Sequence, residues 1–256
     1  QLQVDTYFIA NPNLSSEQSD QFSVGLVYDP FEWLDLSVDY YNIKVADTIS
    51  QISAQDIINM DLDPASWGAI PAGLSITRRA DGSIDEIVAG YANEGDLKTD
   101  GVDFRANTDF DFGGAGRLQN RLTVSWINKY EVTTINGEVV DYIGRMGSPQ
   151  LRANLSNDWS LGDFTFTWNI NYIEGQHTDA SVINGITVAP ARSVGGYATN
   201  DVQVAWQAPW NGKVAIGAMN VGNRYPELVA FDGRPWNFYL YDAYGRTVYL
   251  RYTQSF

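Results

Sequence analysis

The chain has 256 residues without a cysteine, and its formal net charge is −15 at pH 7. The acidity excludes a nucleic-acid partner, because a polyanion would be repelled, and the lack of cysteine excludes disulfides and thiolate metal sites. Aromatic residues make up 13% and charged residues only 18%, yet the mean hydropathy is −0.24 and no run approaches the roughly 20 apolar residues of a transmembrane helix. This balance favours a transmembrane β-barrel, in which half of each strand's side chains face lipid and half face water.

The beginning of the chain predicts antiparallel strands. It starts at Gln1 without the basic and apolar regions of a signal peptide, so we expect none within it. An incomplete first strand is expected before Asn11. Two longer strands follow around residues 22–28 and 34–40, where apolar side chains recur at every second position, and a short turn near residue 30 joins them.

A long acidic connection occupies about residues 46–98. It is predicted to hold a short helix around Ala54–Met60 and a hairpin turn at Asp81-Gly82. The carboxylates of Asp61 and Asp63 are oxygen ligands of the kind that bind calcium, but the connection lacks the spacing of a dedicated calcium motif. We therefore interpret its acidic side chains as a solvated surface and predict no metal site.

The clearest alternation lies in the middle of the chain. From Leu151 to Trp159 the odd positions are mainly apolar and the even positions polar, and the same phase resumes from Phe164 to Tyr172 after a short turn. Nine strands are clear in total. The remaining ones are expected around residues 102–112, 122–130, 202–206, 214–218 and 248–256.

The connections between these strands alternate between short and long. Short turns fall near residues 30, 114, 162 and 210, whereas long connections occupy about residues 46–98, 131–149, 175–197 and 223–245. Short turns on one side and long loops on the other are typical of outer-membrane barrels, whose long loops lie outside the cell. The competing interpretation, a soluble carbohydrate-binding β-sandwich, does not explain why aromatic residues recur at strand ends, where the two membrane interfaces would be.

Five segments resemble those of TonB-dependent outer-membrane receptors, in the order in which that family has them. Each segment alone is weakly specific, but together they cover essentially the whole chain. They are Asn11–Ser19 (NPNLSSEQS), Leu36–Ile43 (LSVDYYNI), Asn93–Phe104 (NEGDLKTDGVDF), Gly217–Pro226 (GAMNVGNRYP) and Tyr241–Arg246 (YDAYGR).

The resemblance implies an all-β fold, a transmembrane antiparallel β-barrel in which residues 1–256 supply the C-terminal part, about ten strands of about 22. It implies import of a scarce nutrient across the outer membrane of a Gram-negative bacterium: a siderophore, cobalamin, an oligosaccharide or a peptide. The implied partners are the plug and N-terminal strands of the same receptor, the TonB complex acting on the plug, the barrel-assembly machinery and outer-membrane lipid. No plug or TonB box is recognisable here, so we interpret the chain as part of a receptor or one piece of a split one, and we expect no cofactor.

The end of the chain is similar to the C-terminal signal that the barrel-assembly machinery recognises in this family. The residues that carry this similarity are Gly245, Val248, Leu250, Tyr252 and Phe256. The sequence departs from the pattern at Gln254, where an apolar or aromatic residue is usual.

Residues of the long connections are the candidates for ligand contact. They combine flat aromatic faces with bidentate donors, which suit sugars, peptides or anionic chelates. The candidates are Arg78, Arg79, Tyr91, Tyr142, Arg145, Arg192, Trp236 and Tyr239.

One alternative is a ten-stranded barrel that is complete in itself, either a passive pore or a protease. His177 with Asp179 in a predicted outer loop is similar to the Asp–His pair of the omptin proteases. Because the chain has one histidine and many aspartates, such a neighbour arises easily by chance. We predict no catalytic residue and no enzyme.

Overall fold

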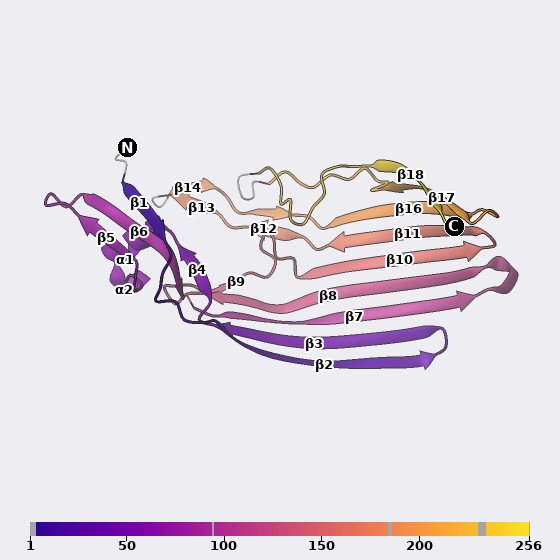
Figure 1. Ribbon diagram of the computed structural model, residues 1–256, viewed down its shortest axis with the longest axis horizontal. Coiled ribbons are helices and arrows are strands. Elements are labelled where there is room, and N and C mark those ends of the chain that lie inside the picture. The colour runs from indigo at the N-terminus through magenta and orange to yellow at the C-terminus, as the bar shows by residue number, and fades with distance from the viewer. Residues whose placement is uncertain (1–3, 94, 184–185, 230–233, 256) are drawn as a thin grey trace. The chain divides into compact units, whose positions relative to one another are not determined.

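The computed structural model describes residues 4–93, 95–183, 186–229 and 234–255 (Figure 1). The chain divides into two compact units. The first contains Gln1–Phe22, Asn42–Asp100 and Lys129–Tyr142, and the second contains Ser23–Tyr41, Gly101–Asn128 and Ile143–Phe256. Neither α-helix in the described part of the chain has the length and hydrophobicity that crossing a bilayer requires.

One large antiparallel sheet accounts for most of the chain. Its long strands neighbour one another in chain order, and with the short β9 the sheet has ten strands, which confirms the predicted number. The short turns between these strands lie together at one end of the sheet (Figure 1). The strands are β2 (Gln18–Phe31), β3 (Leu34–Ala46), β7 (Leu97–Asp111), β8 (Arg117–Thr133), β9 (Val139–Asp141), β10 (Leu151–Leu161), β11 (Phe164–Ile173), β16 (Tyr197–Gln207), β17 (Gly212–Met219) and β18 (Thr247–Gln254).

The register of the sheet separates apolar from polar side chains. One row across six neighbouring strands consists of Leu118, Trp159, Phe166, Val204, Ile216 and Leu250. The next row, on the opposite face, consists of Gln119, Asp158, Thr167, Gln203, Gly217 and Tyr249. Apart from the half-buried Leu118, the apolar row is exposed, with Ile216 56% and Leu250 74% accessible. A soluble protein rarely exposes so large an apolar surface, whereas a barrel wall presents it to lipid.

Aromatic rings gather near the short turns. Trp33 stacks between Phe31 and Phe110, with both ring centroids 5.1 Å away. The indole of Trp159 donates a hydrogen bond to the carbonyl of Ala115 in the β7–β8 turn, which also contains a 3₁₀ turn at Gly113–Ala115. An apolar ring with a polar edge suits the boundary between hydrocarbon and water. The aromatic belt that the sequence predicted at strand ends is therefore present at this end of the sheet.

The first unit has a small sheet of its own. Strand β6 (Ile84–Asn93) pairs with β1 (Asp5–Ile9) on one edge and with β4 (Ile49–Ile52) and β5 (Ser75–Arg78) on the other. The helices α1 (Ala54–Leu62) and α2 (Pro64–Trp67) belong to this unit. Its core consists of Ile52, Ile57, Met60, Leu74, Ile87, Ala89 and Ala92.

Local sequence explains α1 and the hairpin that follows. The hydroxyl of Ser53 accepts a hydrogen bond from the backbone of Asp56, and the Asp56 carboxylate accepts one from the backbone of Ser53. This capping box satisfies two backbone donors at the start of the helix. Gly82, with a φ of 83°, closes the β5–β6 turn. The predicted helix and hairpin are both confirmed.

The strand predicted before Asn11 exists, but its place differs from the expectation. Strand β1 runs parallel to β6 in the small sheet and does not extend the large one. The absence of a side chain at Gly90 permits this pairing, because a Cβ there would lie 2.7 Å from the carbonyl oxygen of Ile9. The tenth strand of the large sheet is β9, which pairs with β8.

The connection between β11 and β16 contains four short strands. Strand β12 (Gln176–Thr178) pairs with β15 (Arg192–Val194), and β13 (Ser181–Ile183) pairs with β14 (Ile186–Ala189). The connection between β17 and β18, residues 220–246, contains no strand among its described residues. It packs against the polar face of the second unit and forms one wall of the cavity described next.

Candidate ligand-binding site

A cavity of about 620 Å³ lies in the second unit, where the polar face of β8, β10, β11 and β16 meets the β17–β18 connection. Its volume is within the range of small-molecule sites. Most of the side chains that the strands contribute are amides and hydroxyls, and Arg152, Asp201 and Asp242 are the ionisable residues other than tyrosine. The neutral polar residues other than tyrosine are Thr123, Ser125, Asn154, Asn171, Thr199, Asn220 and Thr247.

Strand register brings the polar residues of the cavity together. Asn154 pairs with Asn171, and Asn171 pairs with Thr199 on the next strand, so the three side chains share one face. The Asn154 amide donates to the Asn171 carbonyl oxygen at 2.7 Å. The Asn171 amide in turn donates to the Asp201 carboxylate at 3.3 Å. The result is a continuous row of hydrogen-bonding groups along one wall.

Residues with a left-handed backbone conformation lie at both ends of the β17–β18 connection. Asn220, Asn223 and Gly245 have φ angles of 49°, 51° and 65°, a region that Asn and Gly adopt most readily. The Asn220 side chain accepts from the backbone of Arg224 at 2.9 Å and donates to its carbonyl at 2.7 Å. The Asn223 carbonyl oxygen accepts from the backbone of Arg246 at 3.0 Å. These bonds hold the two ends of the connection together beside the cavity.

A buried polar contact joins three long connections beside the cavity. Gln176 is 4% exposed and accepts a hydrogen bond from the backbone of Gly147 at 2.7 Å. Its amide donates to the hydroxyl of Tyr241, which is 5% exposed and meets Tyr197 edge-on at 5.1 Å. Burial, and to a lesser extent the negative charge of Glu227, raises the pKa of Tyr241. The phenol therefore stays neutral as a structural member of this wall.

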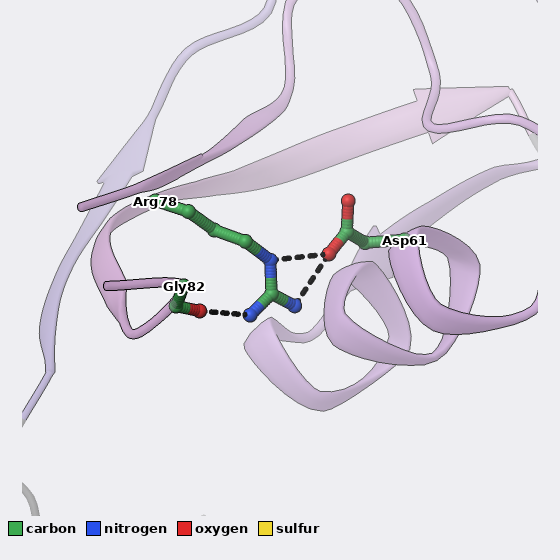
Figure 2. A network of polar contacts seen from close by, with 3 residues as sticks. All are labelled: Asp61, Arg78 and Gly82. Carbon is green, nitrogen blue, oxygen red and sulfur yellow. Dashed lines mark hydrogen bonds and ion pairs between the residues drawn. The ribbon is translucent and has the colours of Figure 1, made fainter. Parts of the chain in front are cut away.

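The predicted ligand residues of the first unit serve its own structure. The Arg78 guanidinium donates to the Asp61 carboxylate at 2.9 Å and to the Gly82 carbonyl at 2.9 Å (Figure 2). Arg79 forms an ion pair with Asp85 at 2.7 Å. Hydrogen bonds and ion pairs of this kind are ordinary for an arginine on the surface of a small folded unit.

The two predicted tyrosines of this unit contact other rings. Tyr91 meets Phe8 edge-on at 5.4 Å, and Tyr142 lies 5.5 Å from the Tyr130 ring. None of these four residues is among those that line the cavity of the second unit.

The other four candidates belong to the second unit, yet none of them lines the cavity. Arg145 pairs with Asp179 at 2.6 Å, and Arg192 donates to the Leu228 carbonyl at 3.3 Å. Trp236 packs against the buried cluster of Ile173, Tyr197 and Tyr241, and with the exposed Tyr239 it lines a more open hollow of about 640 Å³. A ligand role for the eight candidates stays a prediction.

The sequence did not single out the residues that line the cavity. Asn154, Asn171 and Asp201 carry a signal, because they occupy the polar phase of alternating strands. Tyr244 carries the signal of an aromatic residue within a predicted loop. Neither signal distinguishes them from many similar residues until the register aligns the strands.

The structure assigns other partners to the acidic residues that had suggested chemistry. Asp179 pairs with Arg145, while the backbone of His177 bonds to Gly144 and Met146. Asp61 pairs with Arg78, and the Asp63 carboxylate accepts from the backbone of Ser66 at the start of α2. Within the described ranges, no group of three or more His, Asp or Glu side chains is placed to hold a metal ion.

Three residues of the predicted assembly signal lie on the apolar face of the last strand, while Gly245 precedes the strand and lines the cavity. Val248, Leu250 and Tyr252 are exposed and share the face of the apolar row, while Phe256 lies outside the described residues. Gln254, where the sequence departs from the family pattern, bonds to the Tyr252 hydroxyl and donates to the Trp210 carbonyl. Gln254 thus adds polar contacts to two of the aromatic residues near the short turns. Recognition by the assembly machinery stays a prediction.

Comparison with known proteins places this architecture in a family. Residues 1–221 match the family model described as TonB dependent receptor-like, beta-barrel. The chain therefore belongs to the TonB-dependent receptor β-barrel family, whose members are outer-membrane transporters of Gram-negative bacteria rather than enzymes. None of the curated proteins compared with the chain matches it.

Solved structures of complete receptors share the fold. The ferric enterobactin receptor PfeA of Pseudomonas aeruginosa superposes with a TM-score of 0.66 at 15% identity, over 97% of this chain and 32% of its own. The siderophore receptor PirA of Acinetobacter baumannii gives 0.65 at 13% identity, over 97% and 33%. The outer membrane transporter YddB of Escherichia coli gives 0.66 at 12% identity, over 97% and 34%. The chain thus spans about a third of the length of the structures it matches.

Proposed function

We propose that this chain forms part of the wall of an outer-membrane receptor that imports a scarce nutrient with energy from TonB. The observation that carries the proposal is the two-faced sheet, with an exposed apolar row on one side and a polar row bearing a cavity on the other. The apolar face would meet lipid, and the polar face would line the lumen through which the nutrient passes.

The open edges of the sheet support a larger barrel. Strands β2 and β18 end the strand order, and β2 is exposed over almost its whole length. Unpaired backbone groups cannot remain in hydrocarbon, because each raises the free energy of the inserted protein by roughly several kcal/mol. In the membrane both edges would therefore pair with further strands of the same receptor, and a self-contained ten-stranded pore is not favoured.

The partners in this proposal follow from the family. A plug domain would occupy the lumen and transmit the pull of TonB, and the barrel-assembly machinery would insert the protein into the outer membrane. The nutrient would contact the β17–β18 connection and the cavity beneath it. PfeA is a ferric enterobactin receptor and PirA a siderophore receptor, and the likeness of this chain to those two structures shows the fold alone.

Growth of bacteria that express the complete receptor tests this function. Strains with and without the receptor, each with and without TonB, are compared on a panel of single iron, carbon and nitrogen sources. We expect at least one source whose use requires both the receptor and TonB. If the receptor is present in the outer membrane but growth on every source is independent of TonB, the proposal is wrong.

A further inference from the structure

We propose that the cavity beneath the β17–β18 connection binds a neutral, polyhydroxylated ligand, such as a unit of an oligosaccharide. This inference rests on the proposed function and narrows it to a substrate class. It is carried by the charge balance of the cavity, by its hydrogen-bonding groups and by one exposed aromatic ring, which are considered in turn.

The charges of the cavity do not favour an anion. Arg152 supplies one positive charge, whereas Asp201 and Asp242 supply two negative charges. Recognition of a carboxylate or an anionic chelate needs a guanidinium aimed at it, usually through two parallel hydrogen bonds. The nearby guanidinium groups of Arg145 and Arg224 are instead engaged with Asp179 and with the Gly196 carbonyl.

The wall of the cavity suits hydroxyl groups. An asparagine amide both donates and accepts hydrogen bonds, and a threonine hydroxyl does the same. Asn154, Asn171 and Thr199 form a row in which successive side chains share one face, and Asn154 is exposed. A sugar ring presents hydroxyls that alternate between the same two roles, so a row of such residues matches it without any net charge.

An exposed aromatic ring stands at the cavity, on a turn that a backbone hydrogen bond orders. Tyr244 is 86% exposed, although it belongs to a connection and not to the lipid-facing wall. The Asp242 carboxylate accepts a hydrogen bond from the backbone of Tyr244 at 2.9 Å, which orders the turn that carries the ring. An exposed aromatic face beside a cavity with a row of asparagine and threonine side chains offers a platform for the C–H face of a sugar.

Binding to the complete receptor in detergent tests this inference with defined probes. The probes are a printed array of neutral oligosaccharides, an array of uronate-containing oligosaccharides, and two anionic chelates, ferric citrate and a ferric tris-catecholate. The variants are Tyr244→Ala and Asn171→Ala. Their matched controls are Tyr225→Ala, an exposed aromatic residue on the same connection, and Asn169→Ala on the same face of β11, neither of which lines the cavity. Heat-modifiable migration on gels checks that each variant is folded.

We expect neutral oligosaccharides to bind, and both cavity variants to weaken that binding about tenfold while the controls change it less than about twofold. The inference is overturned if no neutral oligosaccharide binds, or if the cavity variants bind as their controls do. It is also overturned if an anionic probe binds and Arg152→Gln abolishes its binding.

The two proposals fail in different ways. TonB-dependent uptake of an anionic chelate through this cavity would leave the proposed function intact and overturn the inference. Binding of neutral oligosaccharides that depends on Tyr244 and Asn171 would support the inference even if growth proved independent of TonB, which would overturn the proposed function.

Discussion

At the scale of single residues, two glycines on the polar face lie beneath tyrosine rings of neighbouring strands. A Cβ at Gly217 would lie 2.5 Å from the ring of Tyr249, and a Cβ at Gly101 would lie 2.5 Å from the hydroxyl of Tyr41. In a strand, glycine normally costs stability because it has no side chain to pack. Here the ring of the neighbour covers the glycine and takes the place of that side chain.

Gly217→Ala should therefore destabilise the barrel by about 1–3 kcal/mol, because the added methyl group displaces the Tyr249 ring. The measurement is the urea midpoint of the receptor folded in lipid vesicles. In a Tyr249→Ala background the same glycine substitution should cost less, since the ring is gone, but a part of the cost should remain because the Val202 carbonyl oxygen would still lie 2.8 Å from the Cβ. Equal costs in the two backgrounds would show that the ring does not constrain this position.

The ionisation of Tyr241 makes the stability of the folded protein depend on pH. Its folded pKa is raised, chiefly by burial, above the unfolded value of about 10. The neutral phenol therefore contributes stability that is fully present below about pH 10 and is lost as pH rises through the folded pKa. We expect the β17–β18 connection to become sensitive to proteolysis above that pH, and Tyr241→Phe to reduce the pH dependence. Cleavage at the same rate on both sides of this pH would contradict the assignment.

At the scale of elements, each long strand has one side for lipid and one for water. On β10 the apolar Leu155 and the polar Ser156 are successive residues that face opposite sides. Such alternation was readable from the sequence because a strand repeats every two residues. The turns were also readable, since each follows the end of one alternating run and precedes the next.

Leu155→Arg should impair insertion into the membrane by about 2–4 kcal/mol if the position lies near mid-membrane, whereas Ser156→Arg should be tolerated. Trp168→Arg and Asn169→Arg on β11 form a second matched pair. The amount of heat-modifiable, folded receptor in outer-membrane preparations reports insertion. Equal tolerance within both pairs would argue strongly against a lipid-facing wall.

Sequence reasoning failed where partners come from distant parts of the chain. Nothing local to Arg78 predicts the carboxylate of Asp61, and nothing local to Arg145 predicts Asp179. The parallel pairing of β1 with β6 is likewise a long-range contact that depends on Gly90. The cavity arises only when the register aligns four strands with the last connection, so its residues could be placed on the polar face but not together.

At the scale of the whole molecule, the exposed apolar face governs behaviour in solution. Trp159, Ile216 and Leu250 are exposed members of one row, and many other large apolar side chains of the sheet are exposed as well. In water this surface would associate with any other apolar surface. The protein should therefore require an amphiphile to remain dispersed.

Removal of detergent from the purified receptor should cause aggregation, and transfer to vesicles or nanodiscs should prevent it. Light scattering during detergent dilution measures the effect. A monodisperse monomer that persists without any amphiphile would contradict both the lipid-facing assignment and the transport proposal.

Asn93 lies at the end of a long connection, beside the residues at which that connection begins. Its side chain donates to the Asp47 carbonyl at 2.8 Å and accepts from the backbone of Ser15, and its backbone pairs with Ile49. The intervening segment encloses its own core around Ile57. A stretch that starts and finishes at adjacent points can be exchanged for another of different length while its flanking strands stay in place. The junction at Asn93 therefore offers a place to graft a foreign segment.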